Sequence, residues 1–396
     1  MKISLFTNGI YPYVMGGMQK HSYNLAKYFA QNRIYIDLYH YVQFDQPLAD
    51  RLIGFSNEEL KFINNICFHF DKPRRYPGHY VLRSYNYSKK IYKSFLNKKN
   101  VDFVYAQGFA GWYYTIQKKK DLSLPPIAVN FHGLEMFQKS PTFYENLKHL
   151  IFKPPVNYIS KSASFNYSLG GKLSPILKNL APNTKIIERP NAISEDWLYE
   201  PSILKENKVR KFVFLGRYVR HKGIQELTKV IKNLSLSYDF EFNFIGPIPK
   251  SKKIINNKVI YHGEIKDETG EALEIKEILR DSDYLVCPSY SEGMPTVILE
   301  AMASGCSIIA SDVGAVQSMV DETNGWLITA GNQKELQKTI LKAIIIEDKD
   351  LKQKKENSIQ KVKKNFMWDI VISSTINDIV TFCKKENRTI NLSRGF

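Results

Sequence analysis

Short apolar runs alternate with amphipathic segments along most of this 396-residue chain, and that alternation limits the fold more than any other feature. The segment 2–7 (Lys-Ile-Ser-Leu-Phe-Thr) is typical of a buried strand. A loop with two glycines follows it, and residues 18–30 then place apolar side chains at helical spacing. Strands that alternate with helices predict a parallel sheet covered by helices on both faces. Further strands are predicted at 34–41, 101–106, 127–131 and 184–188.

The pattern restarts after a polar stretch at about 190–208. Residues 211–216 form a predicted strand that ends in glycine, and a second series of strands and helices follows. We therefore expect an α/β protein with two doubly wound domains, at 1–195 and 205–365, and a ligand site in the cleft between them. The remaining segment, 366–396, contains a helix over about 366–384, which we expect to pack back on the first domain, although it could instead close the second. The second series comprises strands at 240–245, 258–262, 284–287 and 307–310 and helices at 223–234, 271–280, 295–304 and 333–346.

The formal net charge of +17 is concentrated in the first half of the chain. Residues 1–190 hold 26 Lys and Arg against 11 Asp and Glu, and they hold 18 of the 24 tyrosines. A basic, tyrosine-rich half is consistent with a polyanionic partner or an anionic membrane surface. Biased composition is the alternative explanation, but it does not explain why the second half is nearly neutral.

The cysteines and the apolar segments bear on the cellular compartment. Cys67, Cys287, Cys306 and Cys383 are far apart, without the spacing of a metal site, and indicate buried thiols in a reducing compartment. The first residues do not resemble a signal peptide, and no apolar run reaches 18 residues. We expect a cytoplasmic protein, peripheral to the inner face of the cell membrane if it meets a membrane at all.

The segment 287–305 (Cys-Pro-Ser-Tyr-Ser-Glu-Gly-Met-Pro-Thr-Val-Ile-Leu-Glu-Ala-Met-Ala-Ser-Gly) carries the most chemical information. Glu292 follows a strand, and Pro295 suits the first turn of a helix. Backbone amides near Gly293 would face an anion at the helix start. Glu300 lies more than one turn into that helix, where a carboxylate can accept hydrogen bonds from a ribose diol. This arrangement suits a nucleotide sugar, whereas isolated glutamates at this spacing would simply be solvated.

Two further groups of residues follow predicted strands. Arg217 and Lys222 come after Gly216 and could neutralise a diphosphate. His132 ends the strand at 127–131 and is suited to hydrogen-bond a sugar, although such a histidine is more often structural. The pair Asp281 and Asp283 has the spacing of a metal site, but its place between a helix and a strand indicates a structural role.

With these motifs, the chain resembles the family 4 retaining glycosyltransferases of the GT-B fold over nearly its whole length. The stretch 312–320 departs from the family pattern, with Ala315, Gln317 and Ser318 where the family usually has a glycine and a Pro-Glu pair. The matching motifs are 287–305, which corresponds to the E-x7-E region, Gly16-Gly17 before a helix, Asn130-Phe-His132-Gly133, Arg189-Pro190-Asn191, Phe214-Leu-Gly216-Arg217 with Lys222-Gly223, Phe244-Ile-Gly246-Pro and His262-Gly263.

The resemblance implies two Rossmann-like domains that face each other, the first for the acceptor and the second for a UDP- or GDP-sugar. It implies transfer of a hexose-type sugar with retention, without a metal or other cofactor, to a sugar or lipid-linked sugar acceptor. The pathway would be cell-envelope polysaccharide, lipopolysaccharide or glycolipid synthesis. The implied catalytic residues are Glu292, His132, Arg217 and Lys222, and the implied donor-binding residues are Gly16, Gly17, Gly216, Gly293, Met294, Pro295, Thr296 and Glu300.

Two other functions compete with this interpretation. A nucleotide-sugar epimerase of GT-B type would use the same donor motifs. A nucleic-acid-binding protein would use the basic runs at 89–93 and 118–120, but these are apart from the glycine-rich loops and match no nucleic-acid-binding motif. We expect no nucleic acid partner.

Overall fold

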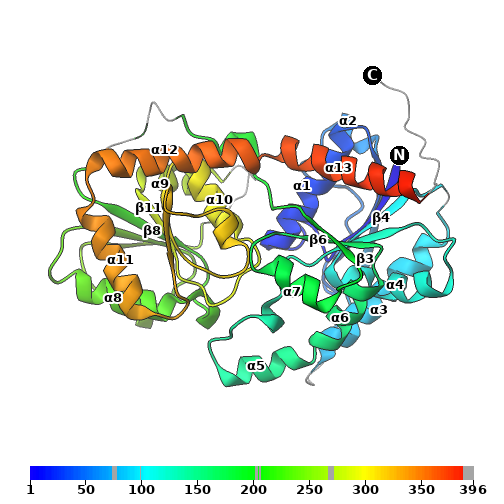
Figure 1. Cartoon of the computed structure of the whole chain (residues 1–396), viewed down its shortest axis with the longest axis horizontal. Coiled ribbons are helices and arrows are strands. Elements are labelled where there is room, and N and C mark those ends of the chain that lie inside the picture. Colours follow the sequence, from blue (N-terminus) through cyan, green and yellow to red (C-terminus); the bar gives the residue numbers. More distant parts are fainter. Residues whose placement is uncertain (74–77, 99, 201–203, 205–206, 266–271, 387–396) are drawn as a thin grey trace.

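The computed structural model describes all residues except 74–77, 99, 201–203, 205–206, 266–271 and 387–396. Two domains lie side by side, each built on one parallel sheet (Figure 1). The predicted pair of Rossmann-like domains is therefore confirmed. The first sheet has the strand order β3-β2-β1-β4-β5-β6-β7 and the second has the order β10-β9-β8-β11-β12-β13.

The strands of the first sheet alternate their side chains between two helical layers. Ile3 and Leu5 pack with α1 (Gly17–Gln31) and α13 (Trp368–Lys385), whereas Phe6 packs with the helices on the opposite face. That opposite layer contains α3 (His79–Phe95), α4 (Trp112–Lys120) and α6 (Lys153–Ser162). The strands are β1 (Lys2–Phe6), β2 (Tyr35–Val42), β3 (Ile63–His69), β4 (Phe103–Gln107), β5 (Ile127–Asn130), β6 (Phe165–Ser168) and β7 (Lys185–Glu188).

The second sheet is covered in the same way. One layer contains α8 (Ile224–Leu234) and α11 (Gln333–Ile345), and the other contains α9 (Leu273–Asp281), α10 (Thr296–Ala303) and α12 (Asp348–Asn365). The strands are β8 (Lys211–Leu215), β9 (Glu241–Ile245), β10 (Val259–Gly263), β11 (Tyr284–Cys287), β12 (Ser307–Ser311) and β13 (Gly325–Ile328). Three short helices complete the first domain, α2 (Asn57–Leu60), α5 (Phe143–Leu150) and α7 (Leu173–Leu180).

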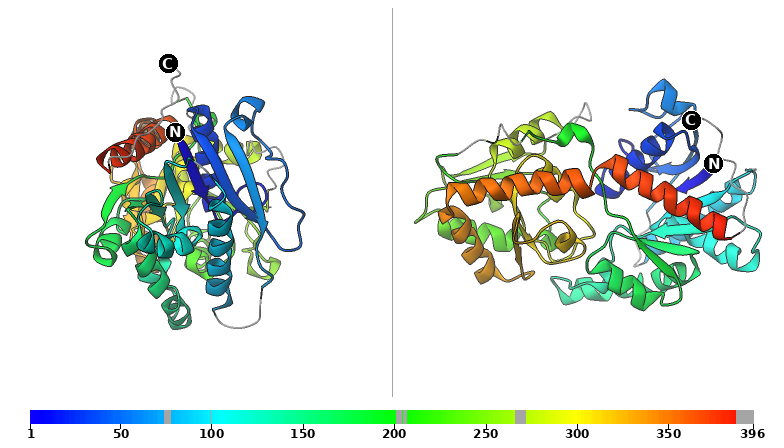
Figure 2. Two further views of the ribbon diagram at one scale, coloured as in Figure 1. Left: turned by 90° about the vertical axis from the view of Figure 1, so that its right-hand side faces the viewer. Right: turned by 45° about the horizontal axis from the view of Figure 1, so that its top comes forward.

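The chain passes between the domains twice, and the two passages lie side by side. After β7 the chain runs through Ile193 to the second domain, and after α12 it returns through Met367 to α13. The backbone of Ile193 bonds to Phe366 and Trp368 on the returning segment, at 2.8 and 3.2 Å. Figure 2 shows α12 and α13 following one another across both domains.

The C-terminal helix therefore packs on the first domain, through contacts between α13 and α1. The helix expected from residue 366 begins at Trp368, because Phe366 and Met367 form the turn after α12. The predicted start of the second domain at 205 lies outside the described residues, as does the first residue of the helix predicted at 271–280.

Candidate active site in the interdomain cleft

The turn between β8 and α8 packs directly on the loop after β11, and glycine makes this possible. Gly223 has a φ of +67°, and a Cβ atom there would overlap the carbonyl oxygen of Pro288. At the end of β8, the Gly216 amide donates to Ile245 at 2.9 Å, and Gly246 packs against the Gly216 carbonyl. These close backbone contacts bring Lys222 next to the loop that carries Glu292.

Lys222 and Glu292 form an ion pair at the bottom of this loop. The Lys222 Nζ atom lies 2.6 Å from Glu292 Oε1, and the Ser289 hydroxyl donates to the same oxygen at 2.7 Å. Burial lowers the pKa of the Lys222 amine, but the charge and hydrogen bond of Glu292, together with the charge of Cys287, raise it, so that the pKa stands above its usual value. The Lys222 amine is therefore held in its charged form beside Glu292.

The other two cations of this turn differ in their environment. Arg220 donates to both carboxylate oxygens of Glu226, at 2.8 and 2.7 Å, and to the Tyr290 hydroxyl at 3.0 Å. Arg217 is exposed and has no side-chain partner among the described residues, although its charge acts on Lys222. Arg220 is therefore committed to the fold, whereas Arg217 is available to a ligand.

The loop of Glu292 meets the first domain at His132. A Cβ atom on Gly293 would overlap the carbonyl oxygen of His132, and the Gln138 side chain donates to the Glu292 carbonyl at 2.8 Å. The His132 Nε2 atom lies 2.6 Å from Gln107 Oε1. Burial lowers the pKa of His132 to about 3, so this imidazole is neutral and can both donate and accept a hydrogen bond.

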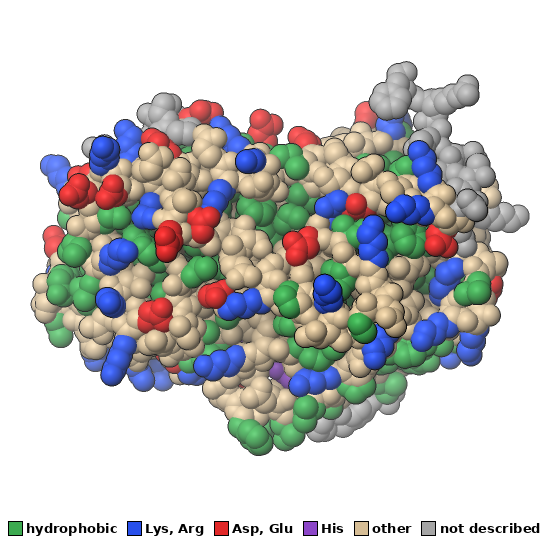
Figure 3. Space-filling model, viewed as in Figure 1, with side chains coloured by type: hydrophobic (Ala, Val, Ile, Leu, Met, Phe, Trp, Pro, Cys, Tyr) green, Lys and Arg blue, Asp and Glu red, His purple; other side chains and the backbone are tan. Residues whose placement is uncertain are grey.

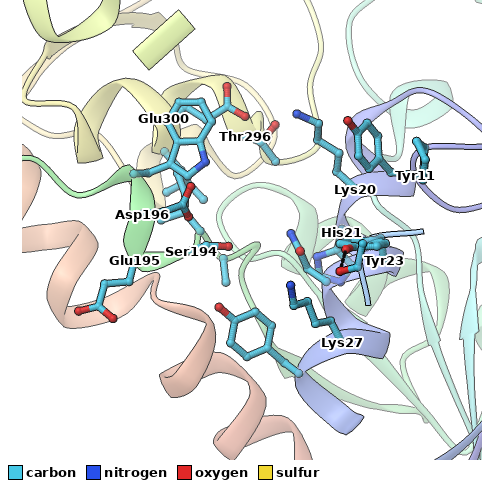
Figure 4. Close-up of a pocket in the computed structure, with 18 of the residues that line it drawn as sticks. Tyr11, Lys20, His21, Tyr23, Lys27, Ser194, Glu195, Asp196, Thr296 and Glu300 are labelled. Carbon is cyan, nitrogen blue, oxygen red and sulfur yellow. Dashed lines mark hydrogen bonds between the residues drawn. The ribbon is translucent and has the colours of Figure 1, made fainter. Parts of the chain in front are cut away.

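A cavity of about 800 Å³ lies beside this contact, between α1, the linker at 192–197 and α10. Figure 4 shows Glu300 and Thr296 on one side of it, facing Lys20 and Tyr11 on the other. Its lining also includes Lys27 from α1 and two linker carboxylates, Glu195 and Asp196. The cavity thus offers groups of both signs, as a ligand with phosphates and hydroxyls requires.

Two helix starts approach each other at this cavity. Gly17 is the first residue of α1, and a Cβ atom on it would lie 3.9 Å from the Thr296 hydroxyl, at the first residue of α10. Neither Gly16 nor Pro295, which precede the two helices, caps its helix with a side chain. The amide groups of both starts and both helix dipoles therefore favour an anion here.

The structure places the predicted residues in two adjacent groups. Thr296 and Glu300 line the cavity, with Gly16, Gly17 and Pro295 at its two helix starts. Glu292, Lys222 and His132 meet where the domains touch, around Gly293. The side chain of Met294 is buried between the domains, where its sulfur and carbonyl accept hydrogen bonds from Asn191 at 3.1 and 2.7 Å. Met294 thus joins the loop to the linker.

The two aspartates with metal-like spacing take part in internal contacts. Asp283 forms a buried ion pair with Lys355 at 3.0 Å and accepts from the Lys211 amide at the same distance. Asp281, the last residue of α9, pairs with the Lys211 side chain at 2.6 Å. Within the described residues, no group of three or more His, Cys, Asp or Glu side chains is arranged to hold a metal ion.

Several residues at the site are missed by sequence reasoning. His21 is buried beside His132, with ring centroids 4.5 Å apart, and neither of its nitrogens has a hydrogen-bond partner in the described part of the chain. Gln107 and Gln138 hold His132 and the Glu292 loop. These residues carry no motif, although Gln107 ends β4 at the same sheet edge as His132, and strand ends at this edge are where a ligand is expected.

Comparison with known proteins shows similarity to glycosyltransferases. Residues 209–345 match the family described as "Glycosyl transferases group 1". Over 370 residues the chain is 27% identical to an uncharacterized glycosyltransferase of Methanocaldococcus jannaschii, covering 91% of this chain and 92% of that protein. It is 25% identical over 291 residues to the N,N'-diacetylbacillosaminyl-diphospho-undecaprenol alpha-1,3-N-acetylgalactosaminyltransferase of Campylobacter jejuni, covering 69% and 74%. The predicted resemblance to glycosyltransferases is confirmed.

Solved structures agree on the fold. Sucrose-phosphate synthase from Thermosynechococcus elongatus superposes with a TM-score of 0.76 at 15% identity, over 97% of this chain and 99% of that one. An Anabaena protein in complex with UDP superposes with a TM-score of 0.65 at 15% identity, over 96% and all of that chain. The predicted GT-B fold is thereby confirmed. The family match and the relative from Methanocaldococcus jannaschii support glycosyltransferase activity.

Proposed function

We propose that this protein is a retaining glycosyltransferase that moves a hexose-type sugar from a UDP- or GDP-sugar to an acceptor hydroxyl. The observation that carries the proposal is the pair of uncapped helix starts, at Gly17 and Thr296, that converge on one cavity with Glu300 about one turn further along α10. Such a site suits a nucleotide whose phosphates lie at the helix starts and whose ribose lies at the carboxylate.

The donor would lie along the loop that carries Glu292 and Gly293 and along the start of α10, which together would hold it from its ribose to its sugar. Glu300 accepts hydrogen bonds from the ribose hydroxyls, and the amides near Gly293 and Thr296 bind the diphosphate. Arg217 and Lys222 stabilise the charge that develops on the diphosphate as the glycosidic bond breaks. Because Lys222 is already paired with Glu292 at 2.6 Å, the exposed Arg217 supplies a cation that has no acidic partner among the described residues.

The sugar would lie near the contact between Gly293 and His132. There Glu292 and the neutral His132 bind its hydroxyls, and the Glu292 carboxylate favours positive charge on the ring in the transition state. Retention without an enzymic nucleophile follows from front-side attack, in which the departing phosphate takes the proton of the acceptor hydroxyl. We propose that no metal takes part, because the cations of the turn can neutralise the leaving group.

The acceptor is proposed to be a sugar or lipid-linked sugar of cell-envelope synthesis. The name of the Campylobacter jejuni relative describes a sugar on diphospho-undecaprenol as its acceptor, and the complex of the Anabaena protein contains UDP. These names support a nucleotide-sugar donor and a sugar acceptor, and we place the protein in the cytoplasm, where nucleotide sugars are made.

A binding screen followed by a turnover assay tests the proposal. A thermal-shift screen of UDP, GDP and their hexose conjugates should raise the melting temperature for one base. With that donor, release of free nucleotide should depend on an added acceptor and should survive EDTA. Epimerisation of the donor sugar without acceptor would identify an epimerase instead, and restoration of EDTA-treated enzyme by Mg²⁺ or Mn²⁺ would contradict the metal-independent step.

A further inference from the structure

The helix α5 exposes its apolar side chains to solvent instead of burying them. Phe143 is 83% exposed, Leu147 54% and Leu150 51%, and these residues lie on one face at spacings of four and three positions. Tyr144 and Ile151 widen the same face. No residue of α5 is buried, so this apolar surface contributes little to the core.

The polar face of α5 is the one that points toward the protein. His149 Nδ1 lies 3.1 Å from the Ser140 hydroxyl, and the charge of Glu145 acts on His221 in the second domain. Thr142 caps the helix by accepting from the Glu145 amide at 3.3 Å. The orientation is therefore fixed by polar contacts, and it is the reverse of an ordinary surface helix.

The apolar face is extended by α3 and flanked by lysines. Exposed Leu82 lies on the first turns of α3, where Gly78 approaches the side chain of Ile151. Lys148 lies over the Tyr144 ring at 4.3 Å, and Lys139 and Lys153 stand on either side of the helix in sequence. In Figure 3, hydrophobic side chains gather at the lower edge of the molecule, where Figure 1 places α5.

We infer that α5 is a docking helix that inserts its apolar face into an anionic lipid bilayer. Aromatic and leucine side chains with lysines at their border fit the boundary between acyl chains and negative headgroups. The first half of the chain, which contains α5, carries a formal excess of +15. This charge favours an anionic membrane over a second copy of the same basic domain.

The place of α5 connects the bilayer to the cleft. Gln138 touches the Glu292 carbonyl, and α5 begins five residues later. Five residues span at most ~18 Å, so the apolar face lies close to the candidate active site. A docked enzyme would reach an acceptor held at the membrane surface, and this last step rests on the proposed function.

Vesicle flotation without donor or acceptor tests the docking. The wild-type protein should float with vesicles of phosphatidylcholine and phosphatidylglycerol, and less with phosphatidylcholine alone. The double variant Phe143→Ser, Leu147→Ser should lower the partition coefficient about tenfold or more, since it removes two inserted apolar side chains. Lys148→Glu should weaken binding only to the anionic vesicles. Leu236→Ser, which changes an 80% exposed leucine of the second domain, is the matched control.

Three outcomes overturn the inference. The first is that the double variant floats like the wild type, and the second is that the Leu236→Ser control loses binding equally. The third is that the wild type dimerises through α5 and does not bind vesicles. The substitution Phe143→Trp adds a second readout, because the emission of the new side chain should shift to the blue on anionic vesicles, whereas that of Leu236→Trp should not. Since no step uses turnover, failure here is distinct from failure of the proposed transferase activity.

Discussion

At the scale of single residues, the two arginines after β8 differ in their role, because one is bound within the fold and the other is exposed. Arg220 is bound by Glu226 and Tyr290, whereas Arg217 is exposed. Arg217→Ala should therefore lower kcat about 10²-fold or more through lost stabilisation of the leaving group, with the melting temperature unchanged. Arg220→Ala should instead lower the melting temperature, because Glu226 loses its cationic partner and keeps only the Tyr290 hydroxyl among its described side-chain partners. Unchanged kinetics in Arg217→Ala would refute the diphosphate assignment.

Glu300 gives a second prediction at this scale. Glu300→Ala should weaken nucleotide binding about 10- to 100-fold in calorimetry, since hydrogen bonds to a charged acceptor contribute ~1.5–3 kcal/mol. Glu195→Ala is the matched control, because Glu195 is a carboxylate that lines the same cavity from the linker. Equal effects of the two substitutions would indicate that the nucleotide responds to the overall charge of the cavity and not to a hydrogen bond at Glu300.

The sequence predicts which site residues belong together, but not how they pair. Glu292 and Lys222 are 70 positions apart, and their ion pair depends on how closely Gly223 packs against Pro288. His21 escapes prediction because it lies within the helical pattern of α1 and is buried only when α13 covers that helix. Long-range packing of this kind is not encoded in local spacing.

At the scale of elements, the predicted strands are those with continuous apolar runs. Ten expected strands are present, whereas β3, β6 and β13 are not predicted. The strand β6 has the sequence Phe-Asn-Tyr-Ser and is fully buried. Its polar residue Asn166 is accommodated there because its side chain donates to the Ser160 carbonyl at 2.8 Å. The edge strand β3 contains Asn64 and Asn65, which bond to Asp37 and Ala49. Tertiary hydrogen bonds thus allow polar residues in strands that local propensity disfavours.

The helix α13 packs on α1 of the first domain through one large side chain. Trp368 is buried and stacks on Tyr28 of α1, with ring centroids 5.2 Å apart. Trp368→Ala should destabilise the first domain by about 3–5 kcal/mol, measured by urea unfolding. Ile370→Ala, on the same helix but 42% exposed, should cost far less. Equal losses would indicate that the helix does not depend on this contact.

At the scale of the whole molecule, several contacts around the cleft join the two domains. The Lys172 amide donates to the Gly314 carbonyl at 2.8 Å, its side chain pairs with Asp312, and Asn191 binds Met294. The departures from the family pattern at 312–320 therefore fall at this interface, because Gly314 packs against Glu292 and Gly171 against Ala315. The excess of basic residues lies in the first domain, which also carries the exposed apolar face of α5. Within the described residues, no helix has the length and apolarity to cross a membrane.

The buried histidines make the stability of the molecule depend on pH. Burial lowers the pKa of His132 to about 3 and holds that of His21 well below its usual value. The unfolded chain binds protons at these positions below pH ~6.5, whereas the folded chain resists them, so the free energy of unfolding falls as the pH decreases from 6.5 toward 3. In His132→Gln, the difference in melting temperature between pH 7 and pH 5 should therefore shrink. His69→Gln, at an exposed histidine of β3, should keep the wild-type difference, and the same shrinkage there would assign the acid sensitivity to the chain in general.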